Sequence, residues 1–93
     1  MKTAIEFIAE KHVKNMKRFP AEVEAPYHQN GELASAAVFT LTNDPQFYPP
    51  NWSKWYLENR IAEENDIENL VNAGALIAAE IERLQRLNLP EAE

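Results

Sequence analysis

The sequence predicts a small all-α domain, and three observations carry that prediction. The 93 residues contain only two glycines, and no stretch longer than four residues alternates between apolar and polar side chains as a half-buried strand would. Three longer stretches instead place apolar residues at the spacing of one helix face. A chain of this length forms one small core, so we expect residues 1–93 to be a single all-α domain with a frayed tail at 90–93.

The first predicted helix covers residues 3–18. Thr3 and Glu6 have the spacing of a capping box, in which each side chain accepts a hydrogen bond from the backbone of the other residue. Pro20 ends the helix, and we expect its apolar stripe to face the core with His12 as a partly buried structural residue. The stripe consists of Ile5, Ile8, Ala9, His12, Val13 and Met16.

A second helix is expected over residues 31–42. Asn30 is its expected N-cap, and the Asn-Asp-Pro segment at 43–45 ends it. Loops are predicted on both sides, at 19–30 and 44–52, because both stretches contain prolines. The helix is rich in alanine, which allows neighbouring helices to approach closely.

The longest predicted helix covers residues 66–88 and is the spine of the fold. Asn65 and Glu68 repeat the capping-box spacing, and Pro90 ends the helix. A shorter helix over 53–63 completes a bundle of three to four helices, and the Ala- and Gly-rich face of the last helix favours a homodimer. The stripe expected to be covered consists of Ile67, Leu70, Val71, Gly74, Ile77, Ala78, Ile81 and Leu84, widened by Ala73, Leu76 and Ala79.

Charge limits the classes of function. Fifteen acidic and nine basic residues give a net charge of −6, which argues against a nucleic-acid partner. The chain has no cysteine, no signal-peptide core and no apolar run of membrane-spanning length, so we expect a cytoplasmic protein without a membrane partner. Residues 1–18 are basic and the rest is acidic, which favours attraction within the fold or a dimer, docking to a basic protein, or mimicry of DNA.

Aromatic residues concentrate ahead of the last helix, where five of the nine lie between positions 47 and 56. Such residues either close a small core as a lid or form a surface that binds a partner, since Trp and Tyr dominate interface hot spots. The acidic run that follows favours a basic partner. The candidate partner-binding residues are Phe47, Tyr48, Trp52, Trp55, Tyr56, Glu63, Glu64, Asp66 and Glu68.

Motifs that carry chemistry are scarce. The sequence has no nucleophile elbow and too few glycines for a phosphate-binding loop. One interpretation of Glu80 is a metal site shared with Glu32, and His28, in the loop ahead of Glu32, is a further candidate site residue. The other interpretation of Glu80 is structural, because a partly buried carboxylate needs a charged partner, and a Lys or Arg of the first helix would supply it.

Three segments together resemble a family of small uncharacterised phage and prophage proteins: IAEK at 8–11, HQNGELASAA at 28–37 and LVNAGALIAAEIERL at 70–84. The family pattern reads approximately IAAERxRQ, EGWTPEHDDxH, GELAxAA, a Trp-rich loop and DLVKAGALIxAEIERL. Its acidic helices are similar to those of all-α MazG-like nucleotide pyrophosphohydrolases, which hold Mg²⁺ on carboxylates. His28, Glu32 and Glu80 match this pattern.

This chain departs from the family pattern where the metal would bind. The family's acidic positions are occupied by Lys11, Ala25, Pro26 and Asn69. Loss of these carboxylates abolishes a Mg²⁺ site, so we expect no metal or cofactor. The resemblance then implies a non-enzymatic phage-type protein that binds and modulates a host protein, such as a defence, nuclease or DNA-repair component. Two alternatives stay open: a Mg²⁺-dependent nucleotide pyrophosphohydrolase with His28, Glu32 and Glu80 as its catalytic set, and an acidic DNA mimic.

Overall fold

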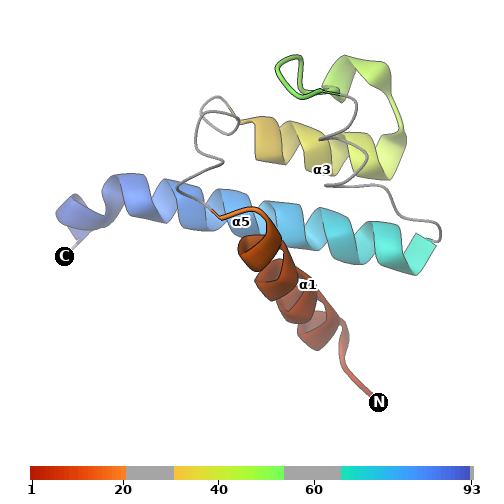
Figure 1. Cartoon of the computed structure of the whole chain (residues 1–93), viewed down its shortest axis with the longest axis horizontal. Helices are drawn as coiled ribbons and strands as arrows, with labels where there is room; N and C mark the ends of the chain where they lie inside the picture. The colour runs from red at the N-terminus through yellow and green to blue at the C-terminus, as the bar shows by residue number, and fades with distance from the viewer. Residues whose placement is uncertain (21–30, 54–65, 93) are drawn as a thin grey trace.

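Helix α5 (Asp66–Ala92) is the longest element, and the other helices pack against it. The computed structural model describes residues 1–20, 31–53 and 66–92. Figure 1 shows α1 (Ala4–Arg18) crossing the middle of α5 and α3 (Glu32–Thr42) running along it, with a 3₁₀ turn, η2 (Pro45–Phe47), after α3. Every regular element within these ranges is helical, which confirms the all-α class.

Helix α1 begins as its sequence predicts. The Thr3 hydroxyl accepts a hydrogen bond from the Glu6 backbone N–H at 3.1 Å, and the Glu6 carboxylate accepts one from the Thr3 N–H at 2.9 Å. Hydrogen bonds with Thr3 lower the pKa of Glu6 below its usual range, and the bond from the Thr3 backbone N–H has the larger effect. The capping box is therefore confirmed, and the helix ends at Arg18, as expected.

Helix α3 confirms the predicted element with one correction at its start. Its N-cap is Gly31 rather than Asn30, and Gly31 has a φ of 79°, a left-handed conformation that costs glycine little. At the other end Asn43 is the C-cap with a φ of 57°, which asparagine tolerates better than most residues. The predicted end at 43–45 is thus confirmed.

Helix α5 continues to Ala92, so the prediction that Pro90 ends it is wrong. A proline lacks the N–H that bonds to the carbonyl four residues earlier, but within the last turn this loss affects only the helix end. The predicted cap Asn65 and the predicted helix 53–63 lie outside the described residues, apart from Ser53.

The core lies mainly between α3 and α5 and is built largely from small residues. Alanines on both helices allow a close approach, and Leu33 and Leu76 fill the centre with at most 1% of their surface exposed. Phe39 and Tyr48 pack against its edge. The buried cluster comprises Phe19, Leu33, Ala36, Ala37, Trp52, Ala73, Leu76 and Ala79.

The large apolar residues predicted to face the core of α5 are mostly exposed, which corrects the expected stripe. The reason is that α3 covers the opposite face, around Leu76, where alanines permit close packing. Gly74 does face a neighbour, because an added Cβ there would stand 2.8 Å from Cδ1 of Ile8 on α1. The exposed fractions are 70% for Ile67, 60% for Leu70, 46% for Ile77, 52% for Ile81 and 43% for Leu84.

The predicted stripe of α1 is also only partly covered. Ile8, His12 and Met16 are half-buried, whereas Ile5, Ala9 and Val13 are exposed. The N-terminal half of α1 projects away from α5 beyond the crossing (Figure 1), so residues there have little to pack against. Helical periodicity identified the apolar positions but carried no information on the crossing of the two helices.

Candidate functional site

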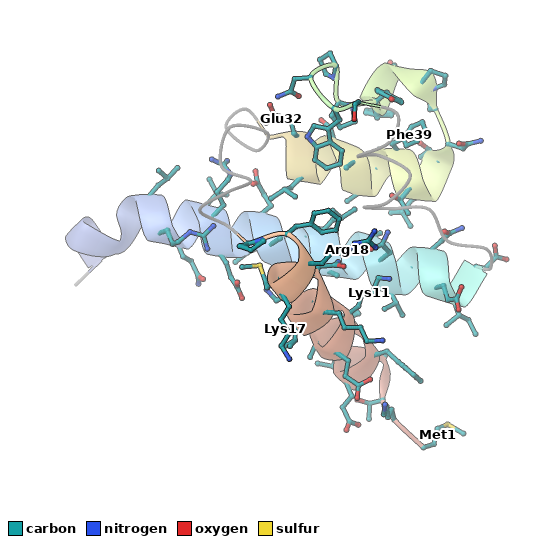
Figure 2. All side chains as sticks on the ribbon, viewed as in Figure 1. Met1, Lys11, Lys17, Arg18, Glu32 and Phe39 are labelled. Carbon is teal, nitrogen blue, oxygen red and sulfur yellow. The ribbon has the colours of Figure 1, made fainter. Side chains whose placement is uncertain are left out.

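Two acids that the sequence singles out, Glu32 and Glu80, are each held by a neighbouring side chain. Glu32 lies in the first turn of α3 (Figure 2), is only 6% exposed, and accepts a hydrogen bond from the Asn51 side-chain amide at 3.0 Å. Glu80 on α5 accepts two hydrogen bonds from Arg83, at 2.6 Å from Nε and 3.1 Å from Nη2. Both acids are therefore structurally engaged.

Arg83 links the two acids electrostatically. Its hydrogen bonds to Glu80 raise the pKa of the guanidinium, burial opposes that rise, and the negative charges of Glu80 and then Glu32 add to it. Glu80 is thus bonded directly to Arg83, whereas Glu32 acts on the guanidinium through its charge. A Mg²⁺ ion would have to displace a bidentate Arg–carboxylate pair, which is among the stronger charge-assisted contacts.

The partner of Glu80 differs from the one predicted. A Lys or Arg of the first helix was expected, but Arg83 comes from the same helix, three residues further on. Residues three apart on a helix are surface neighbours, so this spacing was a usable signal in the sequence. His28, the third member of the catalytic alternative, lies outside the described residues. Within the described part of the chain no three His, Asp or Glu side chains gather as a metal site would require.

His12 joins α1 to α5, which confirms a partly buried structural histidine. Its Nε2 lies 2.9 Å from a carboxylate oxygen of Glu82, and its side chain is 13% exposed. Within the described ranges, Nδ1 of His12 and Nδ2 of the nearby Asn15 are buried without a hydrogen-bond partner. The contact between α1 and α5 is therefore polar and not fully satisfied by hydrogen bonds.

The described aromatic residues of the predicted partner surface close the core. Trp52 is 3% exposed within the core cluster, so its ring is not presented to a partner. Tyr48 packs edge-on against Phe39, with ring centroids 5.6 Å apart, and Phe47 is half-buried. Trp55, Tyr56, Glu63 and Glu64 lie outside the described residues. Asp66 and Glu68 are exposed at the start of α5.

A groove of about 390 Å³ lies between α1 and the N-terminal half of α5, and we call it the α1–α5 groove. The side chains of Lys11 and Lys17 leave α1 on different sides (Figure 2), and of these two Lys11 is the one that borders the groove. Sequence reasoning missed this site, because it is created by the crossing of two helices that are distant in sequence. The lining residues are Phe7, Glu10, Lys11, Lys14, Ile67, Glu68 and Val71.

Comparison with protein-family models, curated proteins and solved structures finds no match. In the described part of the chain no helix combines the length and the apolar character needed to cross a membrane.

Proposed function

We propose that this chain is a non-enzymatic accessory protein that acts by binding another protein, and that the α1–α5 groove is the contact site. The resemblance to small phage proteins makes a host protein in the host cytoplasm the proposed target, with modulation or inhibition of a defence, nuclease or DNA-repair component as the effect. The observation that carries the proposal is the groove itself, since it is open and partly apolar.

The groove has the chemistry of a protein-binding site. Phe7 and Ile67 are 42% and 70% exposed, and with Val71 they are the apolar part of the lining. Lys14 and Glu68 are among the charged residues that line the same groove. Protein interfaces commonly combine apolar and charged side chains in this way. Its expected occupant is an amphipathic segment of the target that inserts one or two apolar side chains.

The hydrogen bonds of Glu32 and Glu80 support a binding function over a catalytic one. Arg83 holds Glu80 through two hydrogen bonds, and Asn51 holds Glu32. Each bond occupies a carboxylate oxygen that a metal ion would need. The alternative of a Mg²⁺-dependent nucleotide pyrophosphohydrolase draws support from one observation, the action of both acids on Arg83. A hydrolysis screen of nucleoside triphosphates with Mg²⁺ or Mn²⁺ tests it, and turnover abolished by Glu80→Gln would establish that alternative.

The binding proposal is tested by affinity capture from host lysate at near-physiological salt. The baits are the wild type, the groove variant Phe7→Glu and the control Val13→Glu, which places the same charge on an exposed apolar position of α1 outside the groove lining. We expect one target recovered by the wild type and the control but lost with Phe7→Glu. Equal recovery by all three baits, or no specific recovery, would contradict the groove as the contact site.

A further inference from the structure

A row of apolar residues runs along the outer side of α5. Successive members are separated by seven, four and three residues, which keeps to the heptad spacing by which helices pair in coiled coils. All four are large and exposed by 43–60%. We call this the outer row, and it consists of Leu70, Ile77, Ile81 and Leu84; Gly74 lies in line with it but is covered by Ile8 of α1.

The outer row has almost no charge beside it. The positions next to it on one side of the helix are Val71, Ala78 and Gln85. On the other side of the row there are two acids, Glu80 and Asp66. Glu80 is paired with Arg83, and Asp66 lies at the N-terminal end of α5. Glu68 and Glu82 of α5 lie further around the helix, so the described acids of α5 allow two copies to bring their outer rows together without strong repulsion.

The exposed area is appropriate for weak self-association. The four large side chains leave roughly 400 Å² of apolar surface open per copy, about half of what one partner contributes to a standard interface. Leu41 of α3 is 52% exposed and lines a shallow hollow together with Leu70, so it extends the patch. Burial of this surface in a dimer would add stability to a fold whose own core is small and rich in alanine.

We propose that the outer row pairs with the outer row of a second copy, with the two α5 helices antiparallel and crossing near Ile77. This goes beyond the proposed function, because it uses a different face of α5 from the α1–α5 groove. The two ends of the row are alike around Ile77, with a leucine seven residues away on each side. In the antiparallel pair Leu70 of one copy therefore packs against Leu84 of the other.

Electrostatics favours the antiparallel arrangement. Asp66 and Glu68 are exposed at the N-terminal end of α5, and parallel pairing would bring four acids from the two copies to the same end. Antiparallel pairing separates them by the length of the interface and opposes the two helix dipoles. The burial of about 800 Å² of apolar surface from both copies is below the size of a standard interface, so we expect a weak dimer that forms at high protein concentration.

Sedimentation equilibrium of the full chain, from micromolar to near-millimolar concentration, tests the proposal. We expect the mass to rise from 10.7 kDa towards twice that value, and Ile81→Lys to weaken the dimer by at least about tenfold. Val13→Lys is the matched control, because Val13 is 53% exposed and Ile81 is 52% exposed. The proposal is overturned if the wild type stays monomeric, or if the control weakens the dimer as much as Ile81→Lys. Circular dichroism verifies that each variant is folded.

Cysteine cross-linking tests the orientation, and the natural chain contributes no cysteine of its own. We expect Ile77→Cys to cross-link to itself under mild oxidation and Leu70→Cys to cross-link to Leu84→Cys. Leu70→Cys should not cross-link to itself, because an antiparallel pair holds those positions about 21 Å apart along the helix. Self-linking of Leu70→Cys would instead show a parallel pair and overturn the arrangement. Phe7→Glu should dimerise normally, so failure of the groove proposal leaves this result unchanged.

Discussion

The two sides of α5 differ in a way that hydrophobicity alone does not describe. The inner side, against α3, presents mostly small residues such as Ala73 and Ala79, and they are almost fully buried. The outer row presents larger side chains, such as Ile77 and Ile81, and they are about half exposed. Small residues allow two helix backbones to approach closely, whereas large side chains keep a neighbouring helix further away. Side-chain size therefore distinguishes the face of α5 that packs against α3 from the face that stays exposed.

The largest effect expected from this comparison concerns Leu76, which has no exposed surface in the centre of the core. Leu76→Ala should lower the free energy of unfolding by about 3 kcal/mol, because it removes buried methyl groups and leaves a cavity. Leu70→Ala on the outer row, 60% exposed, should cost less than about 1 kcal/mol in dilute solution. Urea denaturation of both variants measures the difference, and equal losses would show that the two sides of α5 are equally buried.

Gly74 marks the boundary between the two sides, where α1 crosses. Gly74→Leu should destabilise the chain by about 2 kcal/mol, since the new side chain would force α1 away from α5. Gly74→Ala should stay within about 1 kcal/mol of the wild type, because Cδ1 of Ile8 is a mobile end that can shift and alanine favours the helix. Urea denaturation separates the two outcomes. A leucine as stable as alanine would mean that α1 does not pack on Gly74.

The pair of Glu80 and Arg83 on the border of the core is expected to contribute moderately. Glu80→Gln keeps the shape of the side chain but removes its charge, and should cost about 1–2 kcal/mol because Arg83 is only 17% exposed. The control Glu10→Gln breaks the exposed pair with Lys2 and should cost under about 0.5 kcal/mol. Thermal melts with and without Mg²⁺ complete the test. A Mg²⁺-dependent rise in the Tm of the wild type, absent in Glu80→Gln, would instead establish a metal site.

The capping box of α1 should give the smallest effect, because it lies on the part of α1 that projects from the fold. Thr3→Ala should cost about 1 kcal/mol or less at neutral pH. The pKa of Glu6 is lowered in the folded chain, so its share of the cap is present above the ordinary Glu value of 4.5 and is lost as the pH falls through the folded pKa. Glu6→Gln should remove that pH dependence. Far-UV circular dichroism melts at several pH values measure it, and an unchanged acid transition in Glu6→Gln would contradict the assignment.

Local signals in the sequence predicted the local structure well. The cap at Thr3, the end of α3 at Asn43 and the three described helices were all predictable, because each depends on residues close together in the chain. The burial of the apolar stripes was not predictable, since it depends on which neighbour covers each face and on the angle at which α1 crosses α5. Gly74 was the only local hint of that crossing.

The candidate site was likewise predicted from the sequence only in part. Glu32 and Glu80 were identified from spacing and resemblance, and in the structure Glu80 is bonded to Arg83 while Glu32 accepts a hydrogen bond from Asn51. Their actual partners were missed: Asn51 lies 19 residues from Glu32 in sequence, and Arg83 was overlooked in favour of a more distant cation. The α1–α5 groove could not be predicted because no single segment contains it.

The central claim is that the outer row of α5 is a binding face rather than an accident of a small fold. The most direct measurement is the Tm of the wild type and of Ile81→Lys as a function of protein concentration. If a second copy covers the row, mass action raises the Tm of the wild type as concentration rises, whereas the Tm of Ile81→Lys stays nearly constant. A wild-type Tm that does not depend on concentration would contradict the claim.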